Sequence, residues 1–361
     1  MAAGTAKPEQ AVAAGERREA VSGDAQPEFV CPACRAELHH HTGTDERYRC
    51  AACARVYPVV IGIPDFRLLP DPWIGLEDDR EKGRALEAET LDADFEATVR
   101  AYWARTPDTP RDQAERFTQF VVSAEPRAAE WLARASAGDA PRGWWLDVGC
   151  GTADLVLAGS RRGQHVIGID IAFRWLVVAR RRLQRAGVSA PLVCCNGEHL
   201  PFRDRSFRRV VSLGTLEHSL DADAIVAEAA RVLEPGGRLH VRTVNRFSLL
   251  PEPHVGVWGV GFLPRRWADA YVHWRSGQRY EHHRPLSPRE VRSAARASGL
   301  RDVRVAAARL LSTDRARLGA LGAVAPAYEL ARRTPAIGRL VSWGAPLLDL
   351  EARRPPESGP G

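Results

Sequence analysis

The segment that most constrains the fold is an apolar stretch at residues 144–154 that runs into two closely spaced glycines. It reads WWLDVGCGTAD, so a buried strand is followed by a tight turn at Gly149 and Gly151 and then by a helix. Glycine lets the backbone approach a ligand closely, and the start of a helix offers free N–H groups to an anion. The pattern therefore predicts a ligand site at the carboxyl end of this strand.

The nature of that ligand depends on the acidic residues around the turn. A dinucleotide-binding fold needs a third glycine where this chain has Asp154, whose charge would oppose a pyrophosphate. Asp147, just before the turn, suits a ligand that carries an ammonium group, such as the methionine part of S-adenosylmethionine. The acidic pattern favours this methyl donor over a dinucleotide.

Further apolar segments follow at the spacing of alternating strands and helices. A second strand ends at Asp170, nineteen residues past Gly151, where a carboxylate can accept hydrogen bonds from ribose hydroxyls. The other expected strands are residues 192–195, 207–213, 238–244 and 303–311, with a helix over 223–233. This alternation predicts an α/β fold with a doubly wound, mainly parallel, Rossmann-like sheet that binds ligands at the strand carboxyl ends.

The succession DVGCGTA, GIDI, CNGEHLPFRDRSF, SLGTLEH and LEPGGRL resembles the class I S-adenosylmethionine-dependent methyltransferases, particularly the quinone and small-molecule branch. The resemblance implies that Gly149 and Gly151 hold the methionine part and that Asp170 holds the ribose. Asn196 stands where the family has an Asp that reaches the adenine amine, and Gly197 and Glu198 complete that cofactor-binding run. Ala153 replaces the common third glycine, which is a mild departure.

Four of the seven cysteines form two CxxC pairs near the N-terminus, separated by fifteen residues. Cys31, Cys34, Cys50 and Cys53 have the spacing of two knuckles that bind one tetrahedral Zn²⁺, and four thiolates leave no open position for catalysis. We therefore expect a structural zinc ribbon, with His39–His41 in a solvated loop. Residues 57–66 resemble the tail of the small zinc-ribbon proteins that partner tRNA and release-factor methyltransferases.

These patterns divide the chain into six parts. Residues 1–27 are expected to form a disordered leader, 28–68 the zinc ribbon, 69–90 a linker, 91–141 a helical N-terminal part of the catalytic domain, 142–311 the methyltransferase domain, and 312–361 a helical C-terminal extension and tail. Within the extension, an apolar run at 337–348 flanked by arginines suits packing against the main domain, with contact to a membrane surface as the alternative.

Composition limits the partners and the location. The chain has 361 residues, 45% hydrophobic and 27% charged, and no stretch suited to a membrane span or a secretion signal, so we expect a cytoplasmic protein. The net charge of +6 comes almost wholly from arginine, since lysine occurs only at Lys7 and Lys82. A nucleic-acid partner is therefore the less favoured interpretation.

The acceptor side is predicted to lie in an insertion at residues 245–284, rich in aromatic residues and arginine. Arg246, His254, Trp258 and Arg265 are the candidate substrate-binding residues, because pockets combine apolar walls with a few polar anchors. The alternative is a small helical layer that covers the sheet edge. His218, at the end of the fourth strand, is the candidate general base, and its alternative role is a part of the pocket wall.

Three functions remain open at this stage. The first is methyl transfer to a small-molecule acceptor, such as a specialised metabolite, a quinone or a lipid-linked intermediate. The second is methylation of an RNA base, with the zinc ribbon gripping the nucleic acid, although the chain lacks an NPPY-like motif and a PC motif. The third treats the ribbon as an adaptor for a partner protein.

Overall fold

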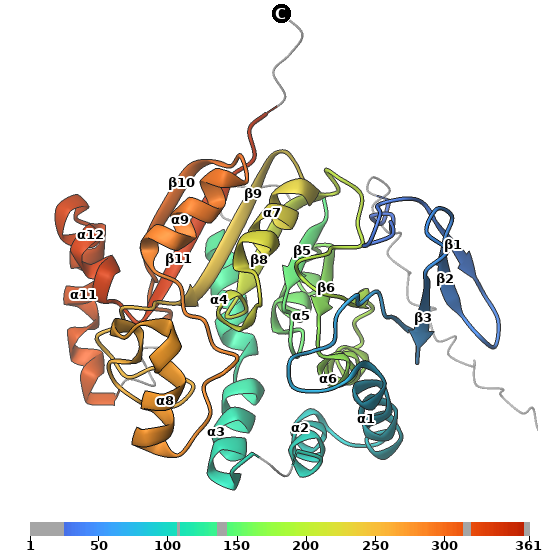
Figure 1. Cartoon of the computed structure of the whole chain (residues 1–361), viewed down its shortest axis with the longest axis horizontal. Coiled ribbons are helices and arrows are strands. Elements are labelled where there is room, and N and C mark those ends of the chain that lie inside the picture. Colours follow the sequence, from blue (N-terminus) through green and yellow to red (C-terminus); the bar gives the residue numbers. More distant parts are fainter. Residues whose placement is uncertain (1–24, 107–108, 136–142, 313–318, 357–361) are drawn as a thin grey trace, which may run out of the picture.

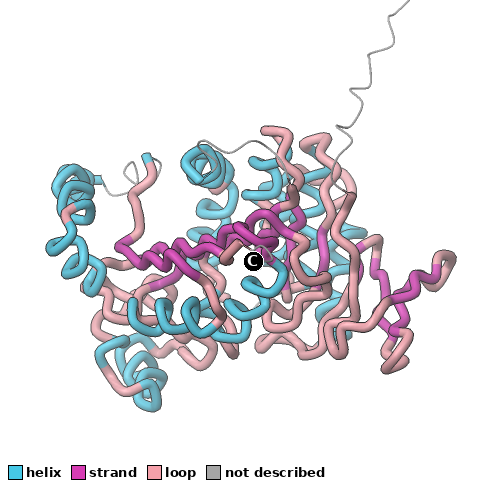
Figure 2. Tube along the Cα trace, turned by 90° about the horizontal axis from the view of Figure 1, so that it is seen from above, coloured by secondary structure: helices cyan, strands magenta, loops and turns pink. Residues whose placement is uncertain are grey.

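The computed structural model describes residues 25–106, 109–135, 143–312 and 319–356. Within these residues the main sheet has seven strands, in the order β10-β11-β9-β8-β5-β6-β7. Figure 2 shows it as a twisted layer with helices on both faces. The strands are β5 (Trp145–Val148), β6 (Val166–Asp170), β7 (Leu192–Cys194), β8 (Phe207–Leu213), β9 (Leu233–Val244), β10 (Arg301–Ala307) and β11 (Leu347–Arg353).

The centre of this sheet is parallel, as predicted. β5 pairs with β6 on one side and with β8 on the other, and both pairings are parallel. The strand order reverses between β5 and β8, and doubly wound folds bind ligands at the strand carboxyl ends near such a reversal. Asp147 and Asp170 lie at the carboxyl ends of β5 and β6. The predicted fold class is confirmed.

The C-terminal segment corrects one prediction. Residues 312–361 were expected to be helical, but β11 enters the sheet between β9 and β10 and pairs antiparallel with both. Its side chains alternate, with Leu348, Leu350 and Ala352 buried. The strand is therefore part of the core and not part of a surface extension.

Helices cover the two faces of the sheet separately. One face carries α4 (Glu125–Ala135), α5 (Asp154–Ser160) and α6 (Phe173–Arg185), with α1 (Leu76–Glu89) and α2 (Phe95–Ala104) packed on α6. The other face carries α7 (Ala222–Val232) and α9 (Pro288–Ala297), which pack on each other. Helix α3 (Arg111–Val122) contacts α2.

The cysteine-rich module consists of β1 (Leu38–His41), β2 (Arg47–Cys50), β3 (Val56–Val60) and β4 (Ile63–Pro64). It lies at the β7 end of the main sheet (Figure 1). Backbone hydrogen bonds from Val30 to Pro201 (3.0 Å) and from Phe66 to Cys194 (2.8 Å) join it to the main sheet. Phe29 and Phe66 form an aromatic cluster with Phe202 of the main domain. The module is docked and shares the core of the main domain.

The prediction of a solvated linker at 69–90 is wrong, because most of this segment is also packed against the main domain. Residues 76–89 form α1, and Asp79 in its first turn is fully buried against α6. The acidic residues of this segment suggested a solvated spacer. In the fold, the buried Asp79 is instead paired with Arg67 and Arg174. His39–His41 also differ from expectation, since they lie on the exposed strand β1 and not in a loop.

The insertion at 245–284 contains η2 (Val260–Phe262) and α8 (Arg265–Ser276) around a small core of its own, formed by Val255, Val257, Val260, Val272 and Tyr280. Figure 1 shows α8 beyond the end of β9. The insertion therefore lies beside the carboxyl end of β9.

Two short helices precede β11, α11 (Ala325–Arg333) and α12 (Pro335–Gly344), after η3 (Gly319–Val324). The predicted packing of the apolar run holds in part: Leu348 is buried and Val341 and Leu347 are half-buried, whereas Leu340 is 73% exposed and Ile337 and Trp343 are also exposed. No helix of the described residues is long and apolar enough to cross a membrane. The predicted disordered leader lies almost entirely outside the described residues.

Candidate active site

The glycine turn after β5 has the geometry that its sequence predicts. Gly149 has a φ of 76°, and the N–H groups of Gly149 and Cys150 both donate to the Ile169 carbonyl at 2.8 Å. A Cβ at Gly149 would lie 2.1 Å from the Thr215 hydroxyl oxygen, whereas a Cβ at Gly151 would meet no atom within 4 Å. Thr215 therefore requires a glycine at 149, and the open side at 151 leaves room for a ligand.

Two carboxyl groups lie beside this turn, the buried Asp147 and the half-buried Asp170. Asp170 accepts hydrogen bonds from the N–H groups of Gly151 (2.9 Å) and Ala172 (2.8 Å), one at each oxygen. Burial raises the pKa of Asp170 to about 6, against the effect of these donors. Burial and the neighbouring Asp170 raise the pKa of Asp147 to about 8. The ionised forms of both acids are thus destabilised in the protein alone. A ligand that brings a positive charge and hydroxyl donors would stabilise them.

The side-chain amide of Asn196 is hydrogen-bonded within the protein. Its side-chain oxygen accepts from the N–H groups of Leu68 (2.9 Å) and Leu69 (3.1 Å), which occupies both lone pairs. Its Nδ2 donates to the Leu69 carbonyl at 3.2 Å. The residue thus anchors the segment that follows the ribbon, and its predicted contact with adenine stays a prediction.

The two residues after Asn196 differ in their surroundings. A Cβ at Gly197 would lie 3.2 Å from Ile225, so this position is packed against α7. Glu198 is half-buried beside it. Their predicted contact with the cofactor stays a prediction.

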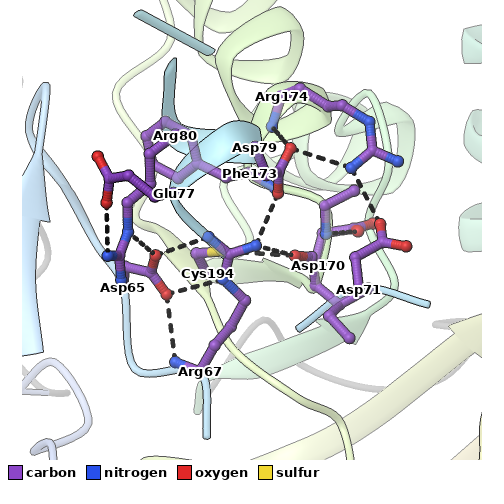
Figure 3. A network of polar contacts seen from close by, with 12 residues as sticks. Asp65, Arg67, Asp71, Glu77, Asp79, Arg80, Asp170, Phe173, Arg174 and Cys194 are labelled. Atoms are coloured by element: carbon purple, nitrogen blue, oxygen red, sulfur yellow. Dashed lines mark hydrogen bonds and ion pairs between the residues drawn. The ribbon is translucent and has the colours of Figure 1, made fainter. Parts of the chain in front are cut away.

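Sequence reasoning missed the charged network behind Asp170 (Figure 3). Arg67, whose side chain has no exposed surface, pairs with Asp65 at 2.7 Å and Asp79 at 2.6 Å, and donates to the Ile171 carbonyl at 3.0 Å. Asp79 in turn accepts from the N–H of Phe173 at 2.8 Å, at the start of α6. The network thereby fixes the backbone that follows Asp170. The arginines and acids were visible in the sequence, but nothing in their spacing showed that they meet.

A cavity of about 390 Å³ opens beside the end of β9. Arg246, Arg265 and His283 are among its lining residues, as are Tyr280 and Arg284. Most of these residues belong to the insertion predicted to bind the acceptor. Trp258 is not among them, since its indole is 57% exposed and donates to the Leu249 carbonyl at 3.1 Å. The structure thus gives no support to Trp258 as a residue of the pocket wall.

The two predicted arginine anchors are held differently. Arg265 pairs with Glu290 at 2.8 Å, so its charge is matched within the protein. Arg246 donates to the carbonyls of Gly261 (3.0 Å) and Leu263 (3.3 Å), and no carboxylate of the described residues lies within ion-pair distance of it. Arg246 is therefore the better candidate for binding an anionic group in the cavity.

The predicted base, His218, lies in a cluster with His254 and His283. The His218 ring centroid is 4.7 Å from that of His254 and 5.1 Å from that of His283. Burial and the neighbouring His254 lower the pKa of His218 to about 4, although part of the ring is open to solvent. His218 is therefore neutral at pH 7 and a weak base, and only the fold reveals its two histidine neighbours.

Comparison with known proteins agrees with this geometry. Residues 146–241 match the family described as Methyltransferase domain. They include the glycine turn, both acids and His218. This part of the chain is a methyltransferase domain.

Relatives of the methyltransferase domain include enzymes of quinone biosynthesis. The Ubiquinone biosynthesis O-methyltransferase of Idiomarina loihiensis is 33% identical over 161 residues, which are 44% of this chain and 62% of that protein. The Ubiquinone/menaquinone biosynthesis C-methyltransferase of Bordetella avium is 36% identical over 122 residues, 33% of this chain and 48% of that protein. The chain thus spans about half to three fifths of the length of these relatives.

Among solved structures, phosphoethanolamine N-methyltransferase 2 of Haemonchus contortus in complex with S-adenosyl-L-methionine is similar to the chain. The TM-score is 0.44 at 19% identity, over 64% of this chain and 52% of that one.

The four cysteines of the N-terminal module converge, as their spacing predicts. Their sulfur atoms lie within 4.8 Å of one another, with Cys31 and Cys53 at 3.7 Å and Cys34 and Cys50 at 3.4 Å. Burial opposes the Cys50 thiolate, but the N–H groups of Cys53 and Ala52 and the thiols of Cys34 and Cys53 together outweigh it, and the pKa of Cys50 is lowered to about 6. Four thiols held in this way, two of them exposed, suit a tetrahedral metal ion beside the methyltransferase domain.

Proposed function

We propose that the chain transfers a methyl group from S-adenosylmethionine to a small-molecule acceptor. The observation that carries this proposal is a pair of acids, the buried Asp147 and the half-buried Asp170, at the carboxyl ends of adjacent strands around the Gly149 turn. Both have a raised pKa, so a ligand with a positively charged ammonium and sulfonium would be bound preferentially there.

On the donor side, each group has a defined part. S-adenosylmethionine supplies an already activated methyl group on a positively charged sulfur. Each Asp170 oxygen accepts one backbone N–H and keeps a lone pair that would accept from a ribose hydroxyl. The open side of Gly151 lets the backbone approach the ligand, and Asp147 would attract the ammonium group. The main task of the protein is to position the acceptor for an in-line displacement.

On the acceptor side, we propose that the cavity beside β9 binds the substrate. Arg246 would hold an anionic or carbonyl group, and His218 would face the nucleophile as a base or a part of the wall. The roles of His254 and Arg265 in substrate binding also remain proposals, Arg265 acting through its fixed pairing with Glu290. The related quinone-biosynthesis enzymes support a small-molecule acceptor in preference to an RNA base.

Exposed apolar side chains indicate the character of that acceptor. They come from the insertion and from α11 and α12, and Phe247 links the two groups through Phe262 (5.7 Å between ring centroids) and Trp343 (6.0 Å). The members are Leu249, Leu250, Trp258, Phe262, Trp267, Trp274, Leu330, Ile337, Leu340 and Trp343. Such a surface suits an acceptor with a long apolar tail, such as a quinone precursor or a lipid-linked intermediate, reached from a membrane surface.

We further propose a structural Zn²⁺ held by Cys31, Cys34, Cys50 and Cys53. The convergence of the four thiols supports it, and the closed ligand set excludes a catalytic water at this ion. Because the module shares the core of the main domain, the ion would stabilise the docked ribbon and, through it, the segment bound to Asn196.

The test is turnover with defined acceptors. Full-length protein is incubated with S-adenosylmethionine and prenylated catechols or hydroxybenzoates, and S-adenosylhomocysteine is measured. We expect acceptor-dependent product, formed more slowly by Asp170→Ala when S-adenosylmethionine is limiting. Product formed only with structured RNA, with activity falling steeply as salt rises, would instead establish the RNA alternative.

A further inference from the structure

Three histidines that are distant in the sequence meet beside the acceptor cavity. His218 ends the 3₁₀ turn after β8, and His254 and His283 come from opposite ends of the insertion. The three ring centroids lie 4.5–5.1 Å apart, and one nitrogen from each ring lies within 4.8 Å of the other two. Imidazole nitrogens in such a group are a set of metal ligands.

A carboxylate orients one of these rings. His254 Nδ1 is 2.5 Å from Oε1 of Glu252, which leaves Nε2 as the ligand atom of His254. Glu252 is buried and is itself fixed by the N–H groups of His254 (2.8 Å) and Val255 (3.1 Å). A carboxylate on the remote nitrogen of a histidine is the usual support of a metal-binding imidazole, because it sets the tautomer and the ring orientation.

A second ring carries a nitrogen that the protein does not satisfy. His283 Nδ1 is buried and has no hydrogen-bond partner among the described residues. The ring stacks on Tyr280 at 5.1 Å and contacts the edge of Trp73, so it is held in place by packing. An unpartnered buried nitrogen within a group of three histidines is explained if an ion is its partner.

We propose that His218, His254 and His283 bind a divalent transition-metal ion of the zinc type, separate from the cysteine site. An ion held at about 2.1 Å from each nitrogen requires nitrogens about 3.4 Å apart, so the rings must close by at most about 1.4 Å, which side-chain rotation supplies. Three neutral imidazoles select Zn²⁺, Co²⁺ or Fe²⁺ over Mg²⁺, which prefers oxygen ligands.

The role of this ion rests on the proposed function. Three protein ligands leave a fourth tetrahedral position, and His283 also lines the cavity proposed for the acceptor. An acceptor hydroxyl at that position would lose its proton to water more readily, because the ion lowers its pKa. The oxygen would then form a bond to the methyl carbon while the carbon–sulfur bond breaks, and the electron pair would leave with S-adenosylhomocysteine.

The experiment measures metal binding directly. Full-length protein is loaded with Zn²⁺, dialysed and analysed for metal per chain, and parallel samples are titrated with Co²⁺ and followed by absorption. The variants are His218→Ala, which changes an exposed ring and so endangers folding least, His254→Ala, and His282→Ala as the matched control. His282 is adjacent to His283 but contacts Trp73 at 4.5 Å and lies outside the cluster. A S-adenosylhomocysteine titration of each variant reports whether the donor site is intact.

We expect two ions per chain in the wild type and in His282→Ala, and one in His218→Ala and His254→Ala. The remaining ion should keep the thiolate-to-cobalt absorption of the cysteine site. Unchanged stoichiometry in both cluster variants, or one ion per chain in the wild type, would overturn the proposal. The two proposals can fail independently. If wild-type protein holds two ions but does not bind S-adenosylhomocysteine, methyl transfer is refuted and the metal site is not.

Discussion

Replacing Arg67 by methionine is expected to destabilise the protein strongly and to weaken donor binding. The Arg67 guanidinium makes two bonds to Asp65 (2.7 and 2.9 Å), one to Asp79 (2.6 Å) and one to the Ile171 carbonyl (3.0 Å), all without solvent exposure of its side chain. Methionine fills most of the volume but leaves two buried carboxylates with less compensation.

The expected magnitude follows from what remains. Removing one partner of a buried ion pair costs about 3–5 kcal/mol. Asp65 keeps Arg80 at 2.8 Å and Asp79 keeps Arg174 at 3.0 Å, so we expect a loss of about 3 kcal/mol, the lower end of that range. Since the lost bonds also held the backbone after Asp170, affinity for S-adenosylhomocysteine should fall by at least about fivefold.

The assay is urea unfolding followed by tryptophan fluorescence, with calorimetric titration of the folded variant. The matched control is Arg84→Met, which removes an exposed pair with Glu77 (2.9 Å) and should cost less than about 1 kcal/mol. If both variants lose the same small amount of unfolding free energy, the network is not a structural support of the donor site and the reasoning is refuted.

Three further predictions concern the zinc ribbon, Asp147 and the acceptor cavity. Cys50→Ser should lower the zinc content by one ion per chain and lower the unfolding midpoint, measured by metal analysis and thermal denaturation; unchanged values would exclude the structural zinc. Asp147→Asn should be more stable than the wild type by a margin that grows from about pH 6 to pH 8. Over this interval the wild-type carboxyl is ionised in the unfolded state but still protonated in the folded state, where its pKa is raised to about 8, so rising pH favours unfolding of the wild type alone. A margin in urea unfolding that stays constant over this interval would contradict the assignment. Arg246→Met should abolish most turnover while donor affinity stays within about 1 kcal/mol, whereas Trp258→Ala, at an exposed position, should change turnover only severalfold. A larger loss of turnover in Trp258→Ala than in Arg246→Met, measured by steady-state kinetics, would show that the acceptor does not bind in the cavity.

The elements that could be predicted are those that a short run of neighbouring residues determines. The strand before Gly149 and the strand ending at Asp170 are continuous apolar runs closed by an acid or a glycine, and the structure has both where the sequence predicts them. Leu348, Leu350 and Ala352 alternate with charged residues, which is the pattern of a half-buried strand, but β11 was missed because the run is only seven residues long. The strand is recognised from its pairing with β9 and β10, and β9 lies about a hundred residues earlier in the sequence.

The candidate site shows the same division. Residues that act through backbone geometry, such as Gly149, were predictable because a turn has a sequence pattern. Asn196 was assigned to adenine because its position suggested it, but its amide binds the backbone of Leu68 and Leu69, more than a hundred residues earlier. The three histidines and the Arg67 network depend on tertiary contacts between distant segments, which residue spacing does not encode.

The central claim, that the carboxyl ends of β5 and β6 bind S-adenosylmethionine, is tested most directly by calorimetric titration with S-adenosylhomocysteine at about pH 8. The Asp170 carboxyl is ionised there, since its pKa is about 6. The account predicts one site per chain in the wild type and an affinity loss of about 1–3 kcal/mol, or roughly 5- to 150-fold, in Asp170→Ala with its unfolding midpoint retained. No binding by the wild type, or equal affinity in the folded variant, would contradict it.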